Sequence, residues 1–112
     1  MVELILKGLG DLVNIDSLNN LELQIIGECL NATGRGPFFP DWEFDTLFGI
    51  SKQEILEIAH KWPSVDLNEQ VENAIINSLN NLLGYPHNKD SEWGKYISES
   101  REFVQTLFEK IQ

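Results

Sequence analysis

Apolar side chains recur at intervals of three and four residues along most of this chain, and this spacing constrains its fold more than any other feature. Such spacing places the apolar side chains on one face of an α-helix, whereas a strand needs alternation over several residues. No segment of the 112 residues alternates for long enough to require a sheet. The helical stripes comprise Leu18, Leu21, Ile25, Ile26, Cys29 and Leu30; Ile55, Ile58, Ala59 and Trp62; Val71, Ala74, Ile75, Ser78, Leu79 and Leu82; and Val104, Leu107, Phe108 and Ile111.

Capping residues predict where several of these helices begin. Ser51-Lys52-Gln53-Glu54 has the pattern of a capping box, in which the Ser51 hydroxyl accepts from the Glu54 N–H and the Glu54 carboxylate reaches back. Either Asp16 or Ser17 can cap the first stripe. The run Asp66-Leu67-Asn68-Glu69 opens the third, with Glu69 at the position that a capping box would use.

Glycine and proline predict where the helices end. Gly34 and Gly84 are suited to end the first and third helices, and Pro63 ends the helix between them. Met1 to Val13 is predicted to form a short helix, with an edge strand as the alternative. The last helix is capped by Ser98 or Ser100. The predicted helices therefore span roughly 17–32, 40–48, 52–62, 66–83, a short segment around 91–97, and the last stripe.

The overall prediction is a single all-α domain, residues 1–112, with about five or six helices joined by short connections. The only cysteine, Cys29, excludes an internal disulfide and is expected to be a small core residue. The first eight residues carry an acid where a signal peptide carries bases, and their apolar run is too short to span a bilayer. We therefore expect a cytoplasmic protein.

Charge is the strongest signal in the composition. Eight lysines and arginines face 18 aspartates and glutamates, which gives a formal net charge of −10. Direct binding to nucleic acid or to an anionic membrane requires the opposite sign and is disfavoured. A basic protein partner is favoured, although solubility alone also accounts for an acidic surface.

No pattern in the sequence indicates catalysis or a cofactor. The two histidines, His60 and His87, lack the spacing of a zinc motif and are expected to be structural or solvated. Asp41 and Asp45 form a carboxylate pair, but acid–base chemistry would need environments that separate their pKa values. We expect no catalytic, metal or cofactor residues, and an enzyme built on the carboxylates is the least favoured reading.

The stretch from Arg35 to Gly49 combines aromatic and acidic residues in a short helix preceded by a loop. We predict that Asp41, Glu43 and Asp45 surround Trp42 on a partner-binding surface, although Trp42 could equally fill the core. Arg35 is expected to fold back onto Asp41 or Asp45; if it instead faces outward, it is a single cation in an acidic patch. Further candidates for partner binding are Glu69, Glu72, Tyr85 and Trp93.

Two motifs resemble a known family. Arg35-Gly36-Pro37-Phe38-Phe39-Pro40-Asp41-Trp42-Glu43-Phe44, followed by Thr46-Leu47-Phe48-Gly49, and Asn80-Asn81-Leu82-Leu83-Gly84-Tyr85-Pro86-His87 are similar to small acidic bacterial proteins. Some members are immunity proteins of contact-dependent growth inhibition systems, including partners of ribonuclease A-like toxins.

The resemblance implies an immunity protein that binds and neutralises a toxin domain, a basic ribonuclease, by covering its active cleft. The first motif is then either the interface or the scaffold. If it is scaffold, the toxin-facing acids lie elsewhere, at Glu69 and Glu72 or at Glu99 and Glu102. The alternative function is an acidic helical interaction or regulatory module with a non-toxin partner.

Overall fold

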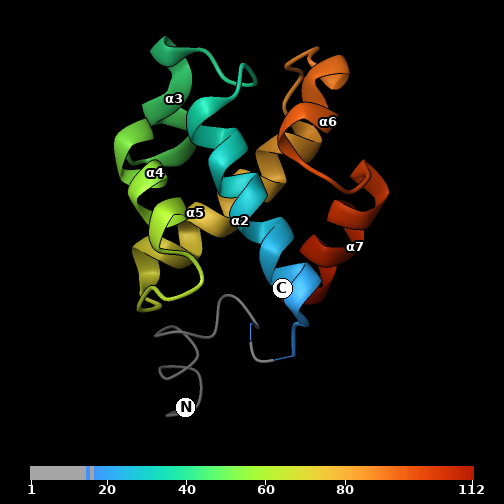
Figure 1. The fold of residues 1–112 in the computed structure, drawn as a ribbon. Coiled ribbons are helices and arrows are strands. Elements are labelled where there is room, and N and C mark those ends of the chain that lie inside the picture. The colour runs from blue at the N-terminus through green and yellow to red at the C-terminus, as the bar shows by residue number, and fades with distance from the viewer. Residues whose placement is uncertain (1–14, 16) are drawn as a thin grey trace.

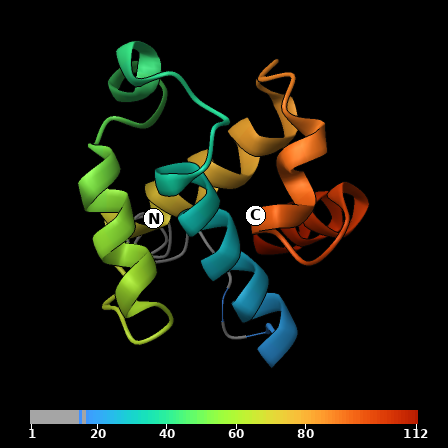
Figure 2. The same ribbon diagram turned by 45° about the horizontal axis from the view of Figure 1, so that its top comes forward.

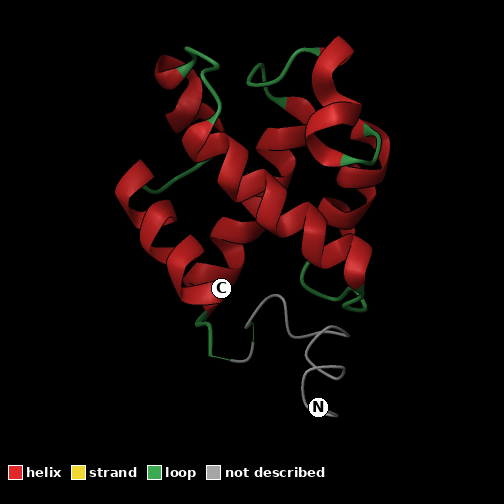
Figure 3. Ribbon diagram, turned by 180° about the vertical axis from the view of Figure 1, so that it is seen from behind, coloured by secondary structure: helices red, strands yellow, loops and turns green. Residues whose placement is uncertain are grey.

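The computed structural model describes residues 15 and 17–112, and this part of the chain is helical without any strand (Figure 3). The prediction for Met1 to Val13 and the candidate cap Asp16 lie outside the described residues. The predicted all-α architecture is confirmed. The elements are α2 (Asn20–Arg35), α3 (Asp41–Phe48), α4 (Lys52–Lys61), α5 (Glu69–Gly84), the 3-10 helix η1 (Asp90–Glu92), α6 (Trp93–Tyr96) and α7 (Arg101–Ile111).

Helices α2 and α5 cross at the centre of the molecule (Figures 1 and 2). On one side of this pair lie α3 and α4, where α4 packs on α2 and α3 packs on α5. On the other side lie α6 and α7, where α6 contacts α2 and α7 contacts α5. Within the described residues, no helix is both long and apolar enough to cross a membrane.

The core follows most of the stripes predicted from the sequence, but Leu21, predicted on the apolar face of the first helix, is 41% exposed. From α2 it includes Ile25, Ile26 and the free cysteine Cys29, all completely buried. The other helices contribute Phe44, Phe48, Ile55, Val71, Ala74, Ile75, Leu79, Leu82, Val104, Leu107 and Ile111. Helix α5 buries residues on a broad face because it contacts both halves of the molecule.

The helix starts are partly as predicted. The Ser51 capping box is confirmed, with the Glu54 N–H donating to Ser51 Oγ at 3.1 Å and the Ser51 N–H to Glu54 Oε1 at 3.0 Å. Ser100 caps α7. Helix α2, however, begins at a second capping box, Asn19 with Glu22, rather than at residue 16 or 17.

Two other predicted helix boundaries need correction, the start of α5 and the end of α2. Asn68, rather than Asp66, caps α5 by accepting from the Val71 N–H at 2.9 Å. Gly34 does not end α2, which continues to Arg35. A Cβ at Gly34 would lie 2.5 Å from Leu56 Cδ2, so glycine is present there because α4 approaches α2 closely.

An aromatic cluster anchors the loop before α3 and α3 itself. The Phe39 and Phe48 ring centroids are 5.0 Å apart, and those of Phe44 and Phe48 are 4.5 Å apart. Phe38, also buried, packs edge-on against His87 with the centroids 5.0 Å apart. Gly49 ends α3 in the left-handed conformation, with φ of 73°, as predicted. These contacts fix one face of α3 and leave the other face to solvent.

Candidate functional site: the acidic surface around Trp42

Trp42 is the most exposed large apolar side chain in the described part of the protein. Of its surface, 82% is accessible to solvent, while Phe44 and Phe48 on the same helix are buried. The uncertainty left by the sequence is therefore resolved, because Trp42 does not fill the core. An isolated exposed leucine would need no explanation, but a tryptophan removes much more apolar surface from water when it is covered.

Three carboxylates accompany Trp42 on α3, and we call these four residues, Asp41, Trp42, Glu43 and Asp45, the Trp42 surface. Asp41 and Asp45 are exposed, and Glu43 is half-buried. The predicted acids therefore do lie together with Trp42 on one short helix. Asp41 and Glu43 occupy the first turn of α3, where the helix dipole favours negative charge.

Two of the three carboxylates are held by other parts of the protein. Lys52, at the start of α4, forms an ion pair with Asp41. The Lys52 ammonium also lies 5.4 Å from the centroid of the Phe44 ring. The hydroxyl of Tyr85, which follows α5, donates a hydrogen bond to Glu43. No sequence motif indicates either contact, because each joins residues from different helices.

Tyr85 links the Trp42 surface to the aromatic cluster of the core. Its ring packs on Phe39 with the centroids 5.5 Å apart. The hydrogen bond to Glu43 raises the pKa of Tyr85 above its usual value, because the carboxylate stabilises the protonated phenol; partial burial and the nearby negative charge act in the same direction. Tyr85 was predicted to bind the partner, and the structure places it beside the predicted acids as the residue that orients Glu43.

Two of the predicted partner-binding residues are not on the surface. Trp93 is only 8% exposed, and its indole N–H donates to the Glu99 carbonyl at 2.8 Å. Glu72 is completely buried within α5. Neither side chain can face a partner in this structure, and we remove both from the candidate surface.

Glu69 is exposed at the first position of α5. It lines a hollow of about 450 Å³ together with Phe48, Gly49 and Asn73, and so lies beside the C-terminal end of α3. Of the acids proposed in case the first motif is scaffold, Glu69 is therefore the one that extends the Trp42 surface. Glu102 is exposed on α7, which packs on the opposite side of the central helix pair.

The prediction for Arg35 is not supported. Arg35 is exposed at the end of α2, and the ion pairs formed within residues 17–112 do not include it. Lys52 takes the place beside Asp41 that the sequence suggested for Arg35.

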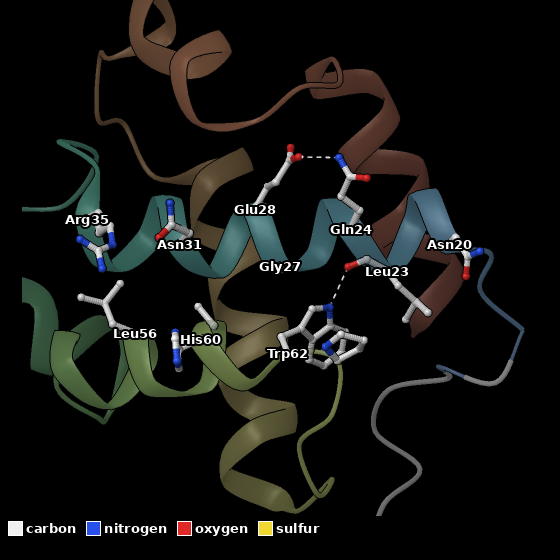
Figure 4. A pocket seen from close by; sticks show the side chains of 12 residues that line it. Asn20, Leu23, Gln24, Gly27, Glu28, Asn31, Arg35, Leu56, His60 and Trp62 are labelled. Carbon is white, nitrogen blue, oxygen red and sulfur yellow. Dashed lines mark hydrogen bonds between the residues drawn. The ribbon is translucent and has the colours of Figure 1, made fainter.

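Arg35 instead lines a groove of about 540 Å³ between α2 and α4 (Figure 4). The Trp62 indole N–H closes one end of this groove by donating to the Leu23 carbonyl at 2.7 Å. Glu28 accepts hydrogen bonds from Gln24 at 2.9 Å and from the Ser98 N–H at 2.8 Å. The bonds to Trp62 and Ser98 therefore join α2 to other segments of the chain, whereas the bond between Gln24 and Glu28 lies within α2.

His87 and Cys29 have structural environments, whereas His60 is exposed on α4. His87 Nε2 lies 3.1 Å from the Leu82 carbonyl at the end of α5, and its Nδ1 accepts from the Lys89 N–H at 2.9 Å. Burial raises the pKa of the Cys29 thiol, which keeps it protonated and unreactive. Among the described residues, no group of three or more histidines, cysteines and acids is placed to hold a metal ion.

The chain matches no protein-family model, no curated protein and no solved structure. Its function must therefore be argued from the Trp42 surface, from the charge of the chain and from the resemblance of its two motifs.

Proposed function

We propose that this chain is an immunity protein that binds a basic toxin domain, a ribonuclease, and covers its active cleft with the Trp42 surface. The observation that supports this proposal most is the 82% exposure of Trp42 on a helix whose other face is firmly anchored. A largely exposed tryptophan between carboxylates is typical of a surface that a partner covers.

Charge supports the choice of partner. A ribonuclease attracts a polyanion, so its active cleft carries basic side chains. A chain with a net charge of −10 presents the opposite sign over its surface. Complementary fields accelerate the encounter and orient the two proteins before close contact.

Charge alone does not give sufficient affinity. Protection of a cell requires nanomolar binding or better, which corresponds to about 12 kcal/mol. An exposed ion pair contributes only about 0–1 kcal/mol. Buried aromatic anchors commonly contribute about 2 kcal/mol or more each. Among the described residues, Trp42 is the most exposed aromatic side chain and can supply such an anchor, and the acids around it set the orientation.

The resemblance of the two motifs to immunity proteins of contact-dependent growth inhibition systems supports the toxin as the partner. The second candidate, an acidic interaction module with a non-toxin partner, would use the same exposed surface. The two differ in what the chain does to a toxic enzyme, so a growth experiment separates them.

The experiment expresses the C-terminal domain of a secreted toxin encoded beside this chain, with and without the chain, and follows growth. We expect the wild-type chain to restore growth and to inhibit RNA cleavage by the purified toxin domain. Trp42→Ala should abolish or strongly reduce the rescue, whereas Asp66→Asn, on the loop before α5, should retain it. If the wild-type chain binds no such toxin, or if RNA cleavage continues in the complex, the proposed function is wrong.

A further inference from the structure

We infer that Trp42 and Asp45 together form the binding site for one arginine side chain of the partner. This inference rests on the proposed function and specifies its chemistry: a guanidinium stacks on the Trp42 indole and pairs with the Asp45 carboxylate. The inference is based on which carboxylates of the Trp42 surface already have a partner within the protein.

Asp41 and Glu43 each have an internal partner. Lys52 neutralises Asp41, and the Tyr85 hydroxyl occupies an oxygen of Glu43. The Asp45 carboxylate is exposed and makes no ion pair or side-chain hydrogen bond with the part of the chain that the structure describes. Asp41 remains 89% exposed in its ion pair, but Asp45 is the one of the three acids that has no internal ion pair or side-chain hydrogen bond among the described residues.

The helix brings Asp45 and Trp42 together. They are three residues apart on α3, so their Cβ atoms lie about 5–6 Å from each other on one side of the helix. Helical side chains tilt toward the N-terminus, which directs Asp45 toward the turn that carries Trp42. A cation between the two can therefore contact the ring and the carboxylate at once.

A guanidinium fits this pair better than an ammonium. It is planar, so it can stack on the indole face and still direct N–H groups from its edge to the carboxylate. Tryptophan is the most favourable aromatic partner for a cation. An ammonium is more strongly hydrated and lacks the planar shape, so it gains less from the ring.

The test titrates the protein with a hexa-arginine peptide whose termini are blocked. Binding is detected by nuclear magnetic resonance from the three indole N–H signals. The indoles of Trp62 and Trp93 donate to backbone carbonyls within the protein and serve as internal references. We expect the Trp42 indole and the Asp45 amide to show the largest saturable changes. A hexa-citrulline peptide, which has the same shape without charge, should not change the chemical shifts of these two signals.

Two variants with the same change in net charge make the test specific. Asp45→Asn should weaken the binding reported by the Trp42 signal by about three- to fivefold, the upper part of the range for one exposed ion pair. Asp41→Asn should weaken it by less than about twofold, because Asp41 pairs with Lys52 and the proposed guanidinium contact is made by Asp45.

Equal weakening by both variants would overturn the inference, because it would indicate a diffuse acidic surface. Equal binding of a hexa-lysine peptide at the Trp42 signal would overturn the choice of guanidinium. The outcome is separate from that of the growth experiment. If the arginine peptide binds at Trp42 and Asp45 but no toxin is neutralised, the proposed function fails while the arginine site remains.

Discussion

At the scale of single residues, the three tryptophans show how one side chain type takes different roles. Trp93 is buried and Trp62 is partly buried, and each uses its indole N–H to tie two segments together. Trp42 is exposed and makes no such bond within the described residues. The sequence could not separate these cases, because Trp42 lies within the same short aromatic run as Phe44 and Phe48, which are buried.

This difference in burial predicts a small effect on stability when Trp42 is substituted and a large loss of stability when Trp93 is substituted. Trp42→Ala should change the free energy of unfolding by no more than about 0.5 kcal/mol, because the exposed ring buries little apolar surface in the folded protein. Trp93→Ala should cost about 3–5 kcal/mol, since it leaves a cavity and an unpaired carbonyl. Urea denaturation followed by circular dichroism measures both. A large loss of stability in Trp42→Ala would show that this ring supports the fold.

Tyr85 gives a prediction about pH. Its raised pKa means that the hydrogen bond to Glu43 stabilises the fold while the phenol is protonated. This contribution is complete at pH below the unfolded value of about 10 and is lost as the pH rises through the folded pKa. Glu43→Gln removes the negative charge that holds the proton, so the pKa of Tyr85 should fall toward its usual value.

Alkaline titration of phenol absorbance measures this pKa, and Tyr85→Phe identifies which part of the signal comes from Tyr85. The stability difference between wild type and Glu43→Gln should also shrink as the pH rises through the folded pKa of Tyr85. An unchanged titration curve in Glu43→Gln would mean that the hydrogen bond between the two side chains does not persist in solution.

At the scale of helices, the sequence predicted the existence of each described element better than its ends. Periodicity and the Ser51 capping box gave α4 almost to the residue, because both signals are local. The start of α2 was predicted at Asp16 or Ser17, and the Asn19 capping box was missed even though Asn19 and Glu22 have the required spacing. The prediction that Gly34 ends α2 was wrong because the role of this glycine depends on Leu56 of another helix, which no local pattern reveals.

The close packing of α2 on α4 predicts the effect of adding one methyl group. Gly34→Ala should destabilise the protein by about 1–2 kcal/mol, because overpacking against Leu56 outweighs the gain in helix propensity. Gly84→Ala is the matched control, since a Cβ there meets nothing within 4 Å. That control should leave stability unchanged or raise it by up to about 1 kcal/mol. Thermal unfolding of both variants decides whether contact between helices, rather than glycine flexibility, explains Gly34.

At the scale of the whole molecule, the sequence predicted a surface around Trp42, and the structure corrects which of the predicted residues are exposed. Composition gave the sign of the charge, and the motif gave the acids around Trp42. The burial of Trp93 could not be foreseen, because it lies on the four-residue α6, whose orientation depends on the neighbouring helices. Glu72 lies on the 16-residue α5, three residues before Ile75 on the broad face that this helix buries, and its charge suggested exposure instead. The engagement of Asp41 by Lys52 and of Glu43 by Tyr85 likewise depends on how α3 sits against α4 and α5.

The central claim is that complementary charge around an exposed tryptophan joins this chain to a basic toxin. The most direct measurement is the dissociation constant of the chain with its toxin domain, determined by calorimetry at low and at high salt. We predict nanomolar binding at low salt that weakens at least about tenfold at high salt, with a smaller salt effect in Asp45→Lys. Binding that is indifferent to salt, or a natural partner that is itself acidic, would contradict the account.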